Sequence, residues 1–223
     1  MNSISVSMDF LLEEGIDEET TYVVVDTYKF STTVVSALSQ DKLDRVYCEP
    51  SVEDLEKYRN DDGFLAGGEM TNGVDEPIGN SPSLIQRIDF PTNKIALTSD
   101  NGARRVYQLV ENGAEDIVLG SLVNAGAVSE YLDDKENWTV IPADAGETPR
   151  FEDYIGSTLI SNLANGLEKT ERVFQEYERR VNDAVVGERF EWKDEEDWNV
   201  CTDVGSLPLV PKWNSDGYFE RFY

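Results

Sequence analysis

Short apolar runs of strand length alternate with helix-like segments over most of this chain, from about residue 20 to residue 165. Residues 22–25 are a β-branched run typical of a central strand, and residues 32–38 then have the composition of a helix. Parallel strands need helical crossovers, so the alternation predicts an α/β fold with a mainly parallel or mixed sheet and helices on both faces. No internal repeat or flexible linker interrupts the pattern, and we expect residues 1–223 to form a single compact domain.

The other expected elements follow from the same patterns of apolar residues. Further strands are predicted at residues 44–48, 64–66, 94–98, 116–120 and 139–143. Helices are predicted at residues 51–58, 102–112, 123–132, 151–163 and 168–186, the last of them long and amphipathic. The charged segment 188–197 is expected to be a surface excursion, after which the tail returns to the core.

Histidine is absent, and acidic residues far outnumber basic ones, with 45 Asp and Glu against 19 Lys and Arg and a net charge of −26. The absence of histidine excludes Ser-His-Asp and Cys-His nucleophiles, phosphohistidine phosphatases and His-ligated metals. The charge argues against direct binding to nucleic acid or to an anionic membrane. Two cysteines, Cys48 and Cys201, give no disulfide framework, and we expect both to fill core space.

The acidic residues are spread along the chain among ordinary apolar segments, and lysine is scarcer than arginine. This pattern favours a halophilic protein, because concentrated salt screens self-repulsion between surface carboxylates. The alternative is an unusually acidic mesophilic protein. The N-terminal residues lack the basic region and apolar run of a signal peptide, and no run is long enough to span a bilayer. We therefore expect a soluble, cytoplasmic protein.

Polar residues follow five of the six predicted strands, at the strand ends where parallel α/β sheets bind their ligands. Carboxylates at such strand ends can hold a hard cation, and hydroxyl, amide and backbone N–H groups at helix starts can hold a phosphate. Taken singly, each loop is equally explained by helix capping or an ordinary turn. The first loop contains Asp26 and Lys29–Thr33, and the second contains Gly67–Glu69 and Gly79–Pro82. The third and fourth contain Thr98–Gly102 and Ser121–Asn124, and the fifth runs from Asp144 to Glu152 and Asp153.

In this order, the segments resemble the 2-phosphosulfolactate phosphatase family, which is associated with coenzyme M biosynthesis. The resemblance runs through nearly the whole chain, and its specificity lies in the colinear order rather than in one motif. It rests on Asp26, Ser31-Thr32-Thr33, Ala37-Leu38, Gly68-Glu69, Gly79-Asn80-Ser81-Pro82, Thr98, Asn101-Gly102, Ser121, Asn124, Ala145-Gly146, Glu152-Asp153, Cys201, Asp203 and Val210-Pro211.

The resemblance implies magnesium-dependent hydrolysis of a small phosphate monoester, by which 2-phospho-3-sulfolactate gives 3-sulfolactate and phosphate. With no histidine, carboxylate-held Mg²⁺ is the simplest device for neutralising the phosphoryl group and orienting water. From position and resemblance, we expect Asp26, Glu69 and Asp153 to be metal ligands and catalytic residues, and Lys29 to be a catalytic and substrate-binding cation. The other expected substrate-binding residues are Ser31, Thr32, Asn80, Ser81, Asn101 and Asn124.

Three departures from the family pattern keep other functions open. The chain has Lys29-Phe30 where the family usually has Arg-Ala, Met70 where a basic residue is common, and Asp144 where cysteine is common. Lysine lacks the planar fork with which arginine binds oxyanions. These features favour a phosphatase for a different phosphorylated small acid, or a non-catalytic descendant that binds an anion or a partner. The amphipathic segment 168–186 leaves a homodimer open as well.

Overall fold

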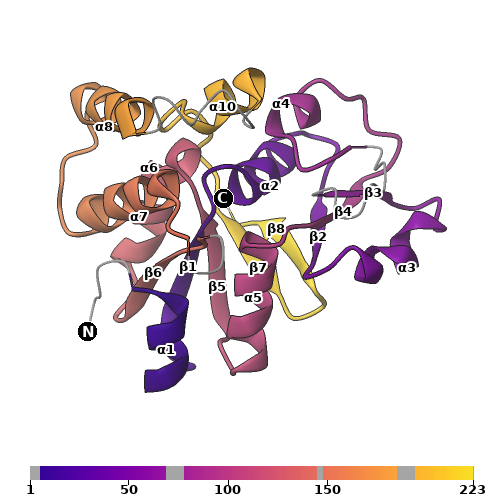
Figure 1. Ribbon diagram of the computed structural model, residues 1–223, viewed down its shortest axis with the longest axis horizontal. Coiled ribbons are helices and arrows are strands. Elements are labelled where there is room, and N and C mark those ends of the chain that lie inside the picture. Colours follow the sequence, from indigo (N-terminus) through magenta and orange to yellow (C-terminus); the bar gives the residue numbers. More distant parts are fainter. Residues whose placement is uncertain (1–5, 69–77, 145–147, 185–193, 223) are drawn as a thin grey trace.

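An eight-stranded mixed sheet runs through the protein in the order β3-β4-β2-β8-β7-β5-β1-β6 (Figure 1). The structure is a computed structural model that describes residues 6–68, 78–144, 148–184 and 194–222. The strands are β1 (Thr21–Val25), β2 (Arg45–Glu49), β3 (Leu65–Gly68), β4 (Lys94–Thr98), β5 (Asp116–Gly120), β6 (Trp138–Pro142), β7 (Pro211–Asn214) and β8 (Tyr218–Arg221).

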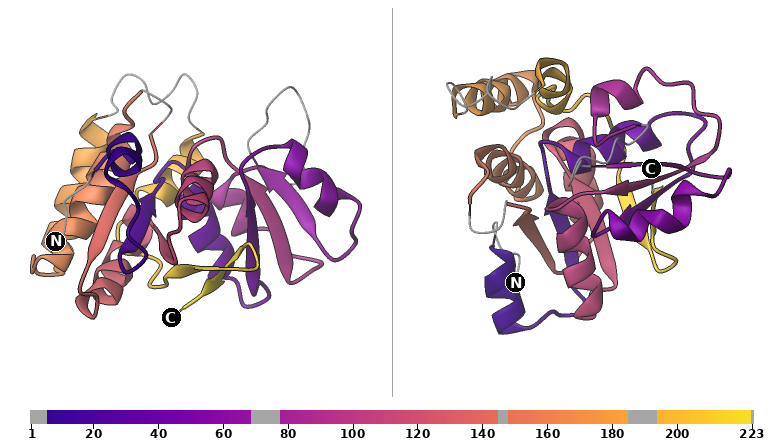
Figure 2. Two further views of the ribbon diagram at one scale, coloured as in Figure 1. Left: turned by 90° about the horizontal axis from the view of Figure 1, so that it is seen from below. Right: turned by 45° about the vertical axis from the view of Figure 1, so that its right-hand side comes forward.

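The sheet consists of two parallel halves that are joined through an antiparallel hairpin. One half is β3-β4-β2 and the other is β5-β1-β6, and all pairings within each half are parallel. The β7–β8 hairpin lies between them, with β8 antiparallel to β2 and β7 antiparallel to β5. Figure 2 shows the two halves on either side of this hairpin. The sheet is therefore mixed, as the alternation of elements allowed.

The chain passes between the two halves along two helices. Helix α2 (Phe30–Leu38) connects β1 to β2, and α5 (Gly102–Glu111) connects β4 back to β5. Each crossing helix begins after the carboxyl end of a strand in one half and leads to a strand in the other half. This topology places the loops after β1 and β4 at the junction of the halves.

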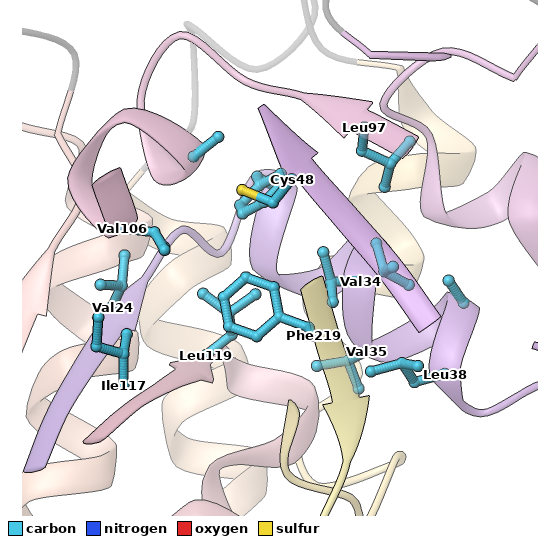
Figure 3. Packing of buried hydrophobic residues seen from close by; sticks show 14 of the residues in the cluster. Val24, Val34, Val35, Leu38, Cys48, Leu97, Val106, Ile117, Leu119 and Phe219 are labelled. Carbon is cyan, nitrogen blue, oxygen red and sulfur yellow. The ribbon is translucent and has the colours of Figure 1, made fainter. Parts of the chain in front are cut away.

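Two hydrophobic clusters lie on opposite faces of β1. Tyr22 and Val24 face a central core that includes residues of α2, α5, both sheet halves and Phe219 of β8 (Figure 3). Val23 and Val25 face a second core with α6 (Ala125–Asp133), α7 (Phe151–Ala164) and the buried Trp198. The alternation of β1 between two apolar environments explains why residues 22–25 of this strand are all apolar or aromatic.

The remaining α-helices of the described residues are α1 (Met8–Glu14), α3 (Glu56–Arg59), α4 (Pro82–Ile85), α8 (Glu171–Ala184) and α10 (Glu195–Cys201). The long amphipathic helix predicted at residues 168–186 is confirmed as α8, which packs on α7. The predicted surface excursion is wrong for residues 195–197, because they begin α10 and Asp197 is buried. None of the helices in the described ranges is long and apolar enough to cross a membrane.

Candidate active site

Asp26 lies at the end of β1, where the two crossing helices begin. Its Oδ1 accepts a hydrogen bond from the backbone N–H of Phe30, the first residue of α2, at 3.2 Å. Its Oδ2 accepts one from the N–H of Gly102, the first residue of α5, at 3.0 Å. The side chain is 3% exposed. Two helix dipoles and two backbone donors therefore stabilise one buried carboxylate.

Asp153 brings a third helix to the same turn. It lies in the first turn of α7, and its Oδ1 accepts a hydrogen bond of 2.7 Å from the backbone N–H of Thr27. Burial, followed by the nearby carboxylates of Asp26 and Glu152, raises the pKa of Asp153 well above its usual range. Buried carboxylates that repel one another favour the binding of a cation between them.

Lys29 reaches from the same turn to α10 and α4. Its Nζ contacts Oδ2 of Asp197 at 2.7 Å, while Oδ1 of Asp197 accepts a hydrogen bond of 2.7 Å from the hydroxyl of Ser81. The hydroxyl of Ser81 also accepts from the N–H of Leu84 and so caps the N-terminus of α4. The Lys29 side chain is 22% exposed, which leaves part of it open to a ligand.

Three expected substrate-binding residues have hydrogen bonds within the protein. Ser31 accepts from the N–H of Asp26 and donates to the carbonyl of Val24. Thr32 donates to the carbonyl of Thr27, and its hydroxyl lies 2.5 Å from that of Ser121. The side-chain N–H₂ of Asn124 donates to two carbonyls, those of Leu119 and Leu209, while its Oδ1 accepts from the N–H of Ser121. These contacts hold the strand-end loops and the tail together.

Asn101 and Asn80 lie near helix starts, and Glu69 lies outside the described residues. Asn101 precedes α5, and its half-buried side chain has no hydrogen-bond partner among the described residues. It adjoins Gly102 and therefore the carboxylate of Asp26. Asn80 is buried immediately before Ser81. Glu69 lies outside the described residues, directly after the end of β3.

The structure therefore brings together Asp26, Asp153 and the loop that contains Asn101, although they come from three separate stretches of sequence. Lys29 and Ser81 are joined to them through Asp197 and the turn after β1. Asn124 lies beside the hydroxyl pair formed by Thr32 and Ser121. No three carboxylate or thiol groups of the described ranges form a cluster that could hold a metal ion.

The two cysteines are buried, and Asp144 is hydrogen-bonded within the protein. Both thiols are buried, and burial raises the pKa of Cys48 and of Cys201 well above the usual range, so both stay protonated at neutral pH. Their expected role in core packing agrees with this burial. Asp144 accepts hydrogen bonds from the N–H of Arg150 and the hydroxyl of Tyr154, which ties it to the start of α7.

Asp197 is a site residue that the sequence reasoning missed. The acidic run around it predicts a surface excursion instead of a buried position. A better signal was the apolar spacing of Trp198 and Cys201 after Asp194, which is typical of an amphipathic helix with an N-terminal cap. Asp194 does accept from the N–H groups of Glu196 and Asp197. On such a helix, Asp197 and Cys201 lie on one face.

The chain is similar to 2-phosphosulfolactate phosphatases. The family model described as 2-phosphosulpholactate phosphatase matches residues 9–216. A 2-phosphosulfolactate phosphatase of Methanocaldococcus jannaschii is 30% identical over 152 residues, which cover 65% of this chain and 63% of the relative. Probable 2-phosphosulfolactate phosphatases of Carboxydothermus hydrogenoformans and Thermotoga maritima are 32% and 29% identical, covering 72% and 71% of this chain and 67% and 71% of those relatives.

Proposed function

The chain belongs to the 2-phosphosulpholactate phosphatase family, a family of phosphoric monoester hydrolases, and we propose that it hydrolyses 2-phosphosulfolactate to 3-sulfolactate and phosphate with Mg²⁺. The observation that carries this proposal is the position of Asp26, whose carboxylate accepts the first N–H of both crossing helices. Phosphate monoesters are very stable in water, so a catalyst must offset phosphoryl charge and orient a nucleophile. A buried acid in this position would serve both tasks through a cation, which would offset the phosphoryl charge and orient water.

We infer that Asp26, Asp153 and Glu69 would hold the magnesium ion. The donor set fits, because carboxylate oxygens are the ligands that this hard cation prefers. The raised pKa of Asp153 supports the same inference, since a cation would relieve the repulsion among the buried acids. When bound, Mg²⁺ would polarise a phosphoryl oxygen and orient water.

The chain's own residues would bind and orient the substrate. The N-termini of α2 and α5 carry partial positive charge next to Asp26, where an oxyanion would be favoured. The amide of Asn101 adjoins this point and is available for a substrate oxygen. Lys29, whose side chain is 22% exposed, would attract the phosphate or the sulfonate through its ammonium group. Burial of both described acids would keep bulk water from the reacting phosphoryl group.

Phosphate release from a panel of small phosphomonoesters tests the proposal. We expect 2-phosphosulfolactate to give the highest kcat/KM, and chelation of divalent cations to abolish release. A protein that releases phosphate from no member of the panel, with Mg²⁺ and molar KCl present, is a binder rather than a phosphatase.

One observation favours a second candidate function. The ammonium group of Lys29 already donates to Asp197, which leaves it fewer N–H donors for a second acidic group on the substrate. A phosphatase for a different phosphorylated small acid, without a sulfonate, would fit this arrangement. In the same panel, such an enzyme would prefer a monoester that lacks a sulfonate over 2-phosphosulfolactate.

A further inference from the structure

Asp197 has an unusually complete set of partners for a residue on a short helix near the surface. Its side chain is 2% exposed and its Oδ2 contacts Nζ of Lys29 at 2.7 Å. Its Oδ1 accepts from the hydroxyl of Ser81 at 2.7 Å and from the N–H and hydroxyl of Ser83 at 3.1 Å and 2.8 Å. A single carboxylate thus connects α10, the start of α4 and the turn after β1.

The helix that carries Asp197 is fixed to that same turn by other contacts. The hydroxyl of Tyr28 accepts a hydrogen bond of 2.8 Å from the N–H of Asp194, the residue that caps α10. The rings of Tyr28 and Trp198 lie 5.8 Å apart, and Trp198 is fully buried. Asp197 is therefore held in place independently of its contact with Lys29.

This rigidity matters because lysine is a flexible residue. Its four-carbon stem carries about 2 kcal/mol of rotamer entropy, and its ammonium group has no fixed geometry. The contact with Asp197 uses one of three N–H donors and fixes the position of Nζ, leaving the others for an anion. Lys29 directly precedes Phe30, and the N–H of Phe30 donates to Asp26, so fixing Nζ also orients Lys29 relative to the buried acid.

We propose that Asp197 is a positioning residue, which orients Lys29 toward the anionic group of the substrate and so sets the KM of the reaction. The inference rests on the proposed function, in which Lys29 binds an anion. It predicts that Asp197 acts through Lys29 rather than on the substrate, since its carboxylate is already filled by protein donors.

A double-mutant cycle on the full chain tests this directly. We expect Asp197→Asn to raise KM by about tenfold to a hundredfold, the range for a lost hydrogen bond to a charged group, and to change kcat by less than about threefold. In a Lys29→Met background, Asp197→Asn should raise KM no further. Effects that multiply in the double variant, or a KM that falls in Asp197→Asn, would overturn the inference. Glu195→Gln, an exposed acid on the same helix, is the matched control and should leave KM unchanged.

Two additions keep the test decisive. Ser83→Ala removes one donor to Asp197 without unpairing Lys29, so it should raise KM by a smaller factor even if Asp197→Asn fails to fold. Binding of inorganic phosphate separates the inference from the proposed function, because it needs no turnover. A wild-type protein that binds phosphate but does not cleave 2-phosphosulfolactate contradicts only the function. Wild-type affinity for phosphate no better than that of Lys29→Met overturns the inference itself.

Discussion

Replacing Gly102 with alanine tests the convergence of the two crossing helices on Asp26. A Cβ at residue 102 would lie 2.7 Å from Oδ2 of Asp26 and 2.5 Å from Cδ1 of Phe30. Ordinary contact begins near 3.4 Å, so the carboxylate oxygen would have to move by about 0.7 Å. Such a shift would strain the hydrogen bond from the N–H of Gly102, which joins the residue after β1 to the start of α5.

The magnitudes follow from these distances. Overpacking a buried site costs about 1–3 kcal/mol, and for a chain of this size a cost of about 2 kcal/mol lowers the thermal midpoint by roughly 4–8 °C. Activity should fall more steeply, because misplacing a reacting group by about 1 Å can cost about 100-fold in rate. We therefore expect Gly102→Ala to remain folded but to lose most of its kcat/KM.

Thermal unfolding followed by circular dichroism and phosphate release measure the two effects. The matched control is Gly126→Ala, also in the first turn of a helix, where the nearest atom to the new Cβ is Cζ of Phe174 at 3.7 Å. This control should keep its activity and gain about 0.5–1 kcal/mol, because alanine is the better helix former. If Gly102→Ala melts and turns over like the wild type, the described packing of Asp26 is refuted.

Three further predictions concern charge. The thermal midpoint and kcat/KM should rise between low and molar KCl, because salt screens the net charge of −26, and a flat or falling response contradicts the halophilic interpretation. Burial opposes ionisation of Asp116, but contacts with Lys135, Thr21, Tyr131 and Lys212 outweigh it and hold its pKa well below the usual range. Asp116 therefore contributes its full stabilisation above about pH 4 and less as the pH falls. Asp116→Asn should lower the free energy of unfolding by roughly 2 kcal/mol at pH 7 and make that free energy fall less in acid, as urea unfolding would measure. Glu69→Gln should abolish magnesium-dependent turnover with an unchanged thermal midpoint, and retained activity would remove Glu69 from the ligand set.

The strands of the two parallel halves were the most predictable part of the fold. Residues 94–98 and 116–120 form strands with the predicted bounds, since apolar runs end there at polar or glycine residues. The β7–β8 hairpin was not predicted, because Pro211 and Trp213 give no clear alternation and the hairpin's place depends on pairing with β2 and β5. The division of the sheet into two halves follows from that non-local pairing.

The site was predictable where strand ends determine it. Asp26 and Asp153 each follow a strand that the sequence predicts to be parallel, and the two carboxylates lie close together in the structure, as expected for metal ligands. The local sequence could not indicate that Lys29 pairs with Asp197, since the two residues are 168 positions apart. Nor could it indicate that the amide of Asn124 would be occupied by two carbonyl groups, one of them from the distant Leu209.

The central claim is that Asp26 holds the cation on which phosphate transfer to water depends. Magnesium-dependent phosphate release by wild type and Asp26→Asn, in molar KCl with 2-phosphosulfolactate, tests it most directly. In Asp26→Asn, the side-chain N–H₂ would face one of the two backbone N–H donors and lose that hydrogen bond. The variant also lacks the negative charge that binds a cation. We predict a folded variant whose release falls by at least about 100-fold at every magnesium concentration. Wild-type turnover by Asp26→Asn, with the same dependence on Mg²⁺, would contradict the account.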